Sequence, residues 1–517
     1  MKIPVLLGIL GIIGSISAAS TAGEKKGPLT GPAVQANNDF ACELYRNLSK
    51  DNEGKNLFFS PYSISNALAM TLEGARGETA AEMGKVMGLP DSLREIGEEG
   101  KIRPWKTGPY HQGFVGLNRR LTKPPDAPKD LAVRTKMADL RDKLNKANGL
   151  IATLQKQGKF NELGKVQEEA RKLADAFNTL AKQVDQYELR VANAVWGEKT
   201  YPFDPAYFAA IEKHYGKDLL RNADFINQFS KERATINRWV EEQTKNRIKD
   251  LIPDYPPEMA RLIRMILVNA IYFKGQWATP FDPKQTKPDT FFLLGGGKTK
   301  APLMHIHHPQ TRYAALSADG TLFETPMTIP FQGGDKVKKY PAGDGFLMVE
   351  LPVKGDKLSM VVIAPQKTDG LAALEARLTG KNLAGWMGNL QKRSVEVTLP
   401  RFKMDTDYSL GDTLQKMGMK LAFIERVADF TGMSASRNPD DRLYISKVLH
   451  KAFVEVNEEG AEAAAATAVI MAVPNSAPAT FPFNPVVRAD RPFLFLIRDM
   501  ESGAVLFLGR VTRPVSK

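Results

Sequence analysis

Three closely spaced histidines, His305, His307 and His308, have a spacing that could support metal binding. On a strand, His305 and His307 would share a face, and two imidazoles on one face are conceivable ligands for a metal ion. No nearby cysteine or acidic residue completes a site with them or with the adjacent His308. We therefore expect a surface strand here and no metal site.

A glycine-rich segment, 295–299, superficially resembles a phosphate-binding loop. Such a loop needs another glycine five residues before Gly297, and that position is Phe292. The segment is better interpreted as a hairpin turn. No nucleophile elbow occurs elsewhere in the chain. We expect neither enzymatic catalysis nor a cofactor.

The most unusual stretch is 458–471, which starts acidic, runs through four consecutive alanines and ends β-branched and apolar. Alanine runs favour helix, whereas Val469 and Ile470 favour strand. From Ala461 onward every second residue is small or apolar, so as a strand the segment could enter a sheet with one face on a core. An Ala-rich surface helix or linker is the alternative, and the pattern alone leaves both open.

The order of residues in this stretch resembles the hinge of the reactive-centre loop of serpins, which are inhibitors of serine proteases. The matching residues are Glu458, Glu459, Gly460, Ala461, Glu462, Ala463, Ala464, Ala465, Ala466 and Thr467. The resemblance implies that a protease cuts the loop and that the hinge then inserts as a new central strand of a large sheet. The attached protease would be distorted while still an acyl-enzyme. Small hinge residues suit this role, because a bulky or charged one would stall insertion or bury an unpaired charge.

Further segments carry the same resemblance, over about 35–120 and 188–515. They are the early signature 56–88, the strands 191–196 and 267–277, the run 445–456 before the hinge, and the C-terminal pair 491–498 and 505–511. The resemblance implies an α+β fold with three β-sheets and about eight or nine helices. It also implies one family domain over 35–517. The single cysteine, which excludes an internal disulfide, and the signal-like residues 1–20 suggest a bacterial exported protein.

The position of the cleaved bond follows from the resemblance by counting from the hinge glycine. The count gives the bond Pro474-Asn475. Proline directly before a cut bond suits few proteases, so cleavage after Met471, Val473 or Asn475 is an alternative.

The expected partner is a target protease, bound covalently as an acyl complex. No lysine or arginine occurs between Lys451 and Arg488. A trypsin-like protease needs a cation for its specificity pocket. We therefore expect a protease that accepts small or apolar side chains, such as an elastase-like or subtilisin-like enzyme.

Five more residues match positions to which the family gives a role. Ser60, Ser63, Asn193 and His450 match a hydrogen-bonded cluster beneath the gap where the sheet opens. Such a cluster would hold two strands together with bonds that can be remade when the loop enters. Trp277 matches the tryptophan near the point of loop entrance. Each of these residues alone is an ordinary polar or aromatic residue, and no carboxylate is placed to make His450 part of a catalytic triad.

Two helix boundaries carry local signals. Ser60 followed by Pro61 is a typical helix start. Gly418 is a typical C-terminal cap for a helix expected over 408–417. Both boundaries lie within the matching segments.

Residues 124–187 depart from the family, which needs far fewer residues here. Apolar residues recur at alternating spacings of three and four from Met137 to Leu154, and again from Leu163 to Tyr187. This pattern predicts an antiparallel, coiled-coil-like helical hairpin. The hairpin could serve partner docking or self-association. The alternative function is thus a non-inhibitory serpin-fold binding or scaffold protein that acts through it.

The whole chain has 517 residues and a net charge of +13. The charge permits binding to acidic surfaces, but no compact basic and aromatic motif for nucleic acid occurs. Residues 1–20 resemble a secretory signal peptide, with Lys2, an apolar run and small residues for cleavage. No apolar run is long enough to span a bilayer comfortably. We expect a secreted protein, extracellular or periplasmic, in which the single cysteine, Cys42, is a buried structural thiol.

Overall fold

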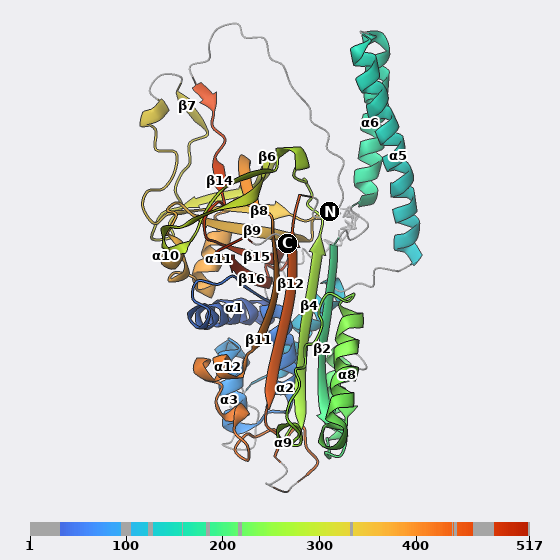
Figure 1. Cartoon of the computed structure of the whole chain (residues 1–517), viewed down its shortest axis with the longest axis vertical. Coiled ribbons are helices and arrows are strands. Elements are labelled where there is room, and N and C mark those ends of the chain that lie inside the picture. Colours follow the sequence, from blue (N-terminus) through green and yellow to red (C-terminus); the bar gives the residue numbers. More distant parts are fainter. Residues whose placement is uncertain are drawn as a thin grey trace, which may run out of the picture.

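The computed structural model describes residues 31–94, 105–121, 128–157, 159–181, 187–215, 220–330, 334–436, 438, 442–458 and 480–514. These residues form an α+β structure with twelve α-helices (Figure 1). The helices are α1 (Pro32–Asp51), α2 (Pro61–Gly74), α3 (Gly77–Val86), α4 (Thr107–Leu121), α5 (Pro128–Lys156), α6 (Phe160–Ala181), α7 (Pro205–Tyr215), α8 (Phe225–Gln243), α9 (Pro257–Ala260), α10 (Leu371–Glu375), α11 (Gly380–Gly388) and α12 (Gly411–Met417). The predicted number, eight or nine beside the hairpin, was too low. Helices of four and five residues, such as α9 and α10, are too short to show a sequence period.

A five-stranded sheet forms the long face of the molecule (Figure 1). Its strands in spatial order are β11 (Phe402–Ser409), β12 (Lys447–Val456), β4 (Met265–Gly275), β2 (Tyr187–Glu198) and β3 (Leu220–Ala223). Nineteen buried hydrophobic residues form a core cluster between this sheet and α8 or the segment after it. Trp196 and Phe225 are among them. The chain therefore closes one face of the sheet over β2 and β4.

A nine-stranded sheet lies across the other half of the molecule. Its main path is β1 (Leu57–Phe59), β16 (Val505–Val511), β15 (Phe493–Asp499), β9 (Leu358–Pro365), β8 (Phe346–Pro352), β6 (Lys298–Leu316), β10 (Gln391–Pro400) and β14 (Val486–Arg488), with β5 (Lys287–Phe292) paired to β6. A third sheet has two strands, β7 (Thr328–Pro330) and β13 (Thr480–Pro482). Three sheets agree with the prediction.

The principal core lies where the two large sheets meet α1 and α2. The ring of Phe58 stacks on those of Phe495 and Phe507, at centroid distances of 5.7 and 5.1 Å. Burying each such side chain contributes roughly 1.5–3 kcal/mol. This packing joins the N-terminal strand β1 to the C-terminal hairpin, so the two ends of the described chain share one core.

Helix α2 runs through this core and begins where the sequence predicts. The hydroxyl of Ser60 accepts a hydrogen bond from the Ser63 backbone N–H, and Pro61 occupies the first helical position. All fourteen residues of the helix are buried. The N-terminus of α2 is therefore fixed in position beneath the five-stranded sheet.

The helix expected over 408–417 begins later than predicted. Tyr408 belongs to β11, where it pairs with His450 of β12, and α12 starts at Gly411. Tertiary pairing with β12 overrides the local signal at this boundary. Gly418 has φ +116°, which confirms its role as the cap.

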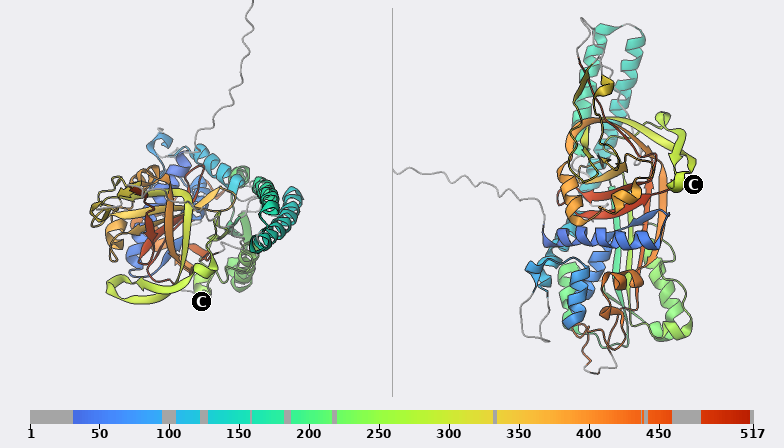
Figure 2. Two further views of the ribbon diagram at one scale, coloured as in Figure 1. Left: turned by 90° about the horizontal axis from the view of Figure 1, so that it is seen from above. Right: turned by 90° about the vertical axis from the view of Figure 1, so that its left-hand side faces the viewer.

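Helices α5 and α6 lie side by side and stand beyond the end of the five-stranded sheet (Figures 1 and 2). Met137 packs with Val133, Phe177 and Leu180 between the two helices. Tyr187 begins β2 instead of ending the second helix. Among the described residues, no helix has both the length and the apolar character that a bilayer-crossing segment needs.

Candidate functional site

The centre of the five-stranded sheet is a parallel pair, β12 and β4. On its outer sides, β11 is antiparallel to β12 and β2 is antiparallel to β4. A chain that left β12 and turned back would run antiparallel to both central strands. Such a strand would replace one parallel ladder with two antiparallel ladders, and antiparallel pairing is the more stable per residue.

The central pair is open at one end. The β12–β4 pairing stops at Phe453 and Tyr272, although β12 continues to Val456 and β4 to Gly275. The last residues of both strands stay paired on their outer sides, to β11 and to β2. The gap thus faces the chain that leaves β12.

Trp277 lies at this open end. Its indole Nε1–H donates a hydrogen bond to the Asn457 carbonyl at 2.9 Å, and the side chain is 6% exposed. Its backbone makes an isolated antiparallel bridge with Val353. The tryptophan therefore joins the end of β4 to the residue that follows β12.

The carboxylate of Glu458, the last described residue before 459–479, is held beside Trp277. Arg401 donates to it from Nε at 2.6 and 2.7 Å, and Thr286 donates from its hydroxyl. The Arg401 Nη2 also forms an ion pair with Glu458 Oε1 at 2.5 Å. The Phe281 backbone N–H donates to the Glu458 carbonyl at 3.0 Å. Burial raises the pKa of Glu458, but the hydrogen bonds from Arg401 and Thr286 outweigh it and leave the pKa below its ordinary value. The first hinge residue is therefore anchored as an ion.

A row of polar side chains crosses the sheet nearer its middle. Strand register places Tyr408, His450, Asn269 and Asn193 opposite one another on β11, β12, β4 and β2. His450 Nδ1 donates to the Asn269 Oδ1 across the central parallel pair. The Asn269 Nδ2 has no acceptor within the described part of the chain. One side-chain hydrogen bond thus joins the two strands that an inserting segment would have to separate.

The start of α2 binds this row from below. The Ser60 backbone N–H donates to His450 Nε2 at 3.0 Å, and the Ser63 hydroxyl donates to Asn193 Oδ1 at 2.7 Å. Asn193 Nδ2 returns a bond to the Ser63 carbonyl at 3.1 Å. The structure therefore brings Ser60, Ser63, Asn193 and His450 together as two linked pairs at one helix N-terminus.

These contacts assign the protonation state of His450. Since a backbone N–H can only donate, Nε2 must accept from Ser60, and the ring proton sits on Nδ1. The side chain is fully buried, and this desolvation lowers its pKa to about 3. His450 is thus a neutral strand-to-strand link at physiological pH.

Most of the predicted hinge, from Glu459 to Thr467, lies outside the described residues. So do the predicted bond Pro474-Asn475 and the alternatives at Met471 and Val473.

Three residues of the site were missed by sequence reasoning. Asn269 lies directly opposite His450 in the ladder, while Arg401 and Thr286 reach Glu458 from distant segments. Asn269 could have been suspected, as a polar residue inside the apolar strand 265–273. Arg401 and Thr286 have no local signal, because only the fold brings them to Glu458.

The histidine group makes ordinary strand contacts. His305 Nδ1 lies 3.0 Å from the Thr398 hydroxyl, and His307 Nδ1 lies 2.7 Å from Glu396 Oε1, both on β10. Glu396 is thus an acidic neighbour that the sequence did not indicate. Within the part of the chain that the structure describes, no group of three metal-ligating side chains occurs.

The remaining local motifs are structural. Phe292 pairs with Lys298, so the glycines between them form the predicted hairpin turn of β5 and β6. Cys42 is 1% exposed, and burial raises the pKa of its thiol to about 12. That confirms a buried structural thiol.

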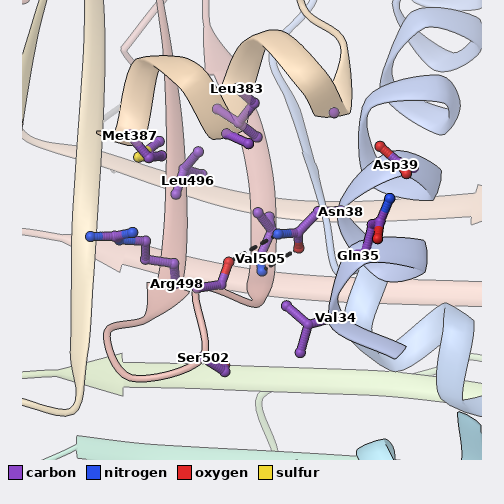
Figure 3. A pocket seen from close by; sticks show the side chains of 13 residues that line it. Val34, Gln35, Asn38, Asp39, Leu383, Met387, Leu496, Arg498, Ser502 and Val505 are labelled. Carbon is purple, nitrogen blue, oxygen red and sulfur yellow. Dashed lines mark hydrogen bonds between the residues drawn. The ribbon is translucent and has the colours of Figure 1, made fainter. Parts of the chain in front are cut away.

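A cavity of about 280 Å³ lies elsewhere, between α1, α11 and the C-terminal hairpin (Figure 3). Leu383, Met387 and Leu496 line one side of it, and Asn38 lies at another side, bonded to Val505 and Gly503. It contains none of the predicted site residues.

Comparisons with known proteins agree with this geometry. A family model described as "Serpin (serine protease inhibitor)" matches residues 35–514. Serpin B4 of Homo sapiens is 35% identical over 482 residues, which are 93% of this chain and 99% of that protein. Leukocyte elastase inhibitor of Sus scrofa is 33% identical over 489 residues, 93% of this chain and 98% of that protein.

A solved structure shows the same fold. The crystal structure of uncleaved ovalbumin has a TM-score of 0.65 at 23% identity, and the match covers 93% of this chain and 100% of that chain. The family model and the identity to relatives along nearly their whole length settle the classification. This chain belongs to the serpin family, a family of protease inhibitors rather than of enzymes.

Proposed function

We propose that this chain is an inhibitory serpin, a suicide substrate that traps a serine protease when its loop is cut and inserted into the five-stranded sheet. One observation carries the proposal. The parallel pair β12–β4 opens directly beside Glu458, where the predicted hinge begins. The hinge is therefore attached to the open end of the position that it would occupy.

The sequence of the hinge suits that position. From Ala461 to Met471, alternate residues are small or apolar, so one face of the inserted strand could rest on α2 and the core beneath it. The other face would point to solvent, where Glu462 is tolerated. The acceptors and donors of β12 and β4 would then pair with the new strand on both sides.

We propose an elastase-like or subtilisin-like protease as the target. The uncharged stretch 463–487 offers no cation for a trypsin-like pocket. One relative is named leukocyte elastase inhibitor, which supports a protease of this specificity. The bond Pro474-Asn475, or a bond after Met471, Val473 or Asn475, would be the one cut.

The test is incubation of the mature protein with pancreatic elastase and, separately, with subtilisin. We expect a protease–inhibitor complex that survives a denaturing gel, with intact mass locating the cut between 471 and 476. Each protease with its nucleophilic serine replaced by alanine is the control and must give no such complex. Clean cleavage by both proteases without a complex, and with protease activity retained, would contradict the proposal for these targets.

The second candidate is a non-inhibitory binding or scaffold protein that acts through α5 and α6. The ring of Phe177 on α6 lies under Arg141 of α5 and Lys354 of the body, at 6.0 and 5.5 Å. The Lys354 backbone N–H donates to the Gln276 carbonyl at 2.7 Å, next to Trp277. A partner bound to these helices would therefore act beside the open end of the sheet.

This candidate has its own test. Leu150 on α5 is 48% exposed, and Leu262 after α9 is 55% exposed at the opposite end of the molecule. If α5 mediates self-association, Leu150→Glu shifts the sedimentation profile to a smaller species and Leu262→Glu does not. Equal profiles for the wild type and both variants would reject self-association through this part of α5.

We further propose that the protein is exported. The support is the signal-like sequence 1–20, which lies outside the described residues. N-terminal sequencing of protein from a cell-free culture supernatant or periplasm should begin just after the small residues 17–20. Recovery of protein that keeps Met1, in the cytosol alone, would contradict export.

A further inference from the structure

The two-stranded sheet joins the C-terminal side of the reactive loop to a distant segment. Strand β13 is the first described element after residues 459–479, and it pairs antiparallel with β7, with Phe481 opposite Ile329 (Figure 1, β13 in red beside β7). The Phe483 backbone N–H donates to the Met327 carbonyl at 2.9 Å and extends the pairing by one position. We call 327–330 with 480–483 the loop ribbon.

An isolated two-stranded ribbon is only marginally stable in water. One end of this ribbon is hydrogen-bonded to β10 of the nine-stranded sheet. Arg393 of β10 donates from Nη1 to the Thr325 carbonyl at 2.8 Å, and from Nη2 to the carbonyls of Pro326 and Phe483, the latter at 3.0 Å. One guanidinium thus holds both strands. The ribbon is therefore held in a defined position on the nine-stranded sheet.

Tyr340 fastens the same end from the other side. Its ring packs edge-on against Phe483 at a centroid distance of 5.9 Å, and its hydroxyl accepts from the Val486 backbone N–H at 3.0 Å. The Lys339 ammonium lies 5.9 Å from the Phe483 ring centroid. Phe483 is therefore partly covered on this face of the ribbon.

The ribbon presents an apolar face with exposed side chains. Residues that oppose one another in an antiparallel pair share a face, and so do residues two apart on a strand. Met327, Ile329, Phe481 and Phe483 thus lie on one face. Met327 is 69% exposed and Phe481 is 38% exposed. No charged residue occurs in 325–330 or in 480–487.

The backbone edges of the ribbon are poorly suited to adding another strand. Pro330 and Pro482, one near the end of each strand, have no N–H to donate, and both are exposed. Binding to the ribbon would therefore use its side-chain face. Exposed methionine and phenylalanine on one face, in two segments without a charged residue, favour an apolar partner surface.

We propose that this face of the loop ribbon is an accessory docking surface for the target protease, beyond the loop residues that enter its active site. The inference rests on the proposed function, since it needs a protease seated on the loop. Thr480 lies five residues after Asn475, and five residues span at most about 18 Å. The radius of gyration of a 250-residue protease is also about 18 Å. A protease seated on the predicted bond would therefore be within reach of the ribbon.

The test compares Met327→Ser, Phe481→Ser and the double variant with Met259→Ser. Met259 is 44% exposed on α9, at the other end of the molecule (Figure 1), so it controls for loss of an exposed methionine. The measurements are the second-order rate constant and the stoichiometry of inhibition, with pancreatic elastase and with subtilisin. A thermal melt of each variant confirms folding.

We expect the double variant to inhibit at least one of the two proteases roughly tenfold more slowly than the wild type does. The rate constants of the single variants should lie between those of the double variant and the wild type. Met259→Ser should match the wild type. The stoichiometry should stay unchanged, because the hinge and the β12–β4 pair are not altered. The rate loss should persist in about 1 M NaCl, since an uncharged contact is not screened by salt. Wild-type rates for the double variant with both proteases, or an equal loss in Met259→Ser, would overturn the docking surface.

A separate binding measurement tests the docking surface if the proposed inhibitory function fails. If the wild type is merely cleaved by both proteases, calorimetry with their serine-to-alanine forms still measures docking. Roughly tenfold weaker binding of the double variant would support the docking surface without inhibition. Equal binding of wild type and double variant, or no binding of either, would overturn it.

Discussion

His450 links the two central strands as a neutral imidazole. His450 is neutral, donates once and accepts once, and it crosses from β12 both to β4 and to α2. Neutral hydrogen bonds of this kind cost little to exchange, whereas a buried ion pair at the same place would have to be broken at a high desolvation cost. The ionised anchor, Glu458 with Arg401, lies at the end of the sheet, where Arg401 is 41% exposed.

Acid should destabilise the native protein through His450. Its pKa is about 3 in the fold against 6.5 as the ordinary value, so on acidification the unfolded chain binds the proton first. The stability from the neutral ring is complete above pH 6.5 and is lost between pH 6.5 and 3. At pH 5 the loss should be about 2 kcal/mol. Urea unfolding at pH 7.5, 6 and 5 measures it.

His450→Gln is the control for this prediction, because His214, His305 and His308 also have pKa values lowered by burial. These three stay in the variant and give the background pH dependence. The wild type should lose about 2 kcal/mol more than His450→Gln between pH 7.5 and 5. Parallel curves for the two proteins would contradict the assignment.

Removing the partner of Glu458 should release the hinge. Arg401→Gln leaves the carboxylate, 4% exposed, with Thr286 as its remaining side-chain donor. We expect the free energy of unfolding to fall by about 1–2 kcal/mol. This is less than the loss for a fully buried ion pair, because Arg401 is partly exposed. The freed chain should also enter the sheet without cleavage, which would appear as inhibitory activity lost over days at 37 °C.

A surface ion pair provides the matched control. Lys416 and Asp51 are 55% and 39% exposed, and Lys416→Gln should keep wild-type activity over the same time. If Arg401→Gln loses activity no faster than Lys416→Gln, the anchor has no part in holding the hinge.

At the scale of elements, the central strands and the hinge fit each other by direction and by alternation. The pair β12–β4 is parallel, so a returning strand is antiparallel to both. Alternate hinge residues from Ala461 are small or apolar, which is what a strand between a core and solvent requires. The two faces of the inserted strand should therefore tolerate charge very differently.

A charge on one face should stop insertion and on the other should not. Ala463→Arg would bury a guanidinium against the core, at a cost of several kcal/mol, whereas Ala464→Arg would place it in solvent. With Ala463→Arg we expect cleavage without trapping and a stoichiometry of inhibition at least roughly tenfold higher. Ala464→Arg should remain close to the wild type. Equal stoichiometries for the two variants would mean that the hinge does not insert with this alternation.

The elements that could be predicted are those with a long pattern or a local cap. The start of α2 at Pro61 and the cap at Gly418 were visible in sequence, and the strands flanking the hinge were found through long matching segments. Strands β7 and β13 were not found, because three residues show no period and their pairing joins positions about 150 residues apart. Tyr408 was placed in a helix because only its pairing with His450 reveals the strand.

The same division holds for the site. Four members of the polar cluster were named from a resemblance and lie together in the fold, whereas Asn269, Arg401 and Thr286 were not named. Side chains that meet only through sheet register or through a chain crossing have no signature in the segments around them. Sequence reasoning therefore identified the segments of the site but not all of the partners that hold them.

At the scale of the whole molecule, the three features that bear on protease trapping gather at one end. The open end of β12–β4 lies there, with the loop ribbon to one side and α5 and α6 to the other (Figure 1). The opposite end, with α9, is where an inserted strand would finish. Insertion would carry residues after Glu458 from the first end toward the second, so it must alter the whole sheet.

Cleavage within the loop should therefore raise the thermal stability of the entire protein. A sixth strand would pair on both sides and replace a parallel ladder with two antiparallel ones. We expect the Tm to rise by at least about 10 °C after limited proteolysis at 471–476, since insertion adds pairing along the full sheet. Differential scanning calorimetry of intact and cut protein measures this shift. Cut Ala463→Arg is the control and should keep the Tm of the intact form, because its hinge cannot enter. An unchanged Tm for the cut wild type would show that the central pair does not accept the loop, and inhibition by insertion would then be excluded for this chain.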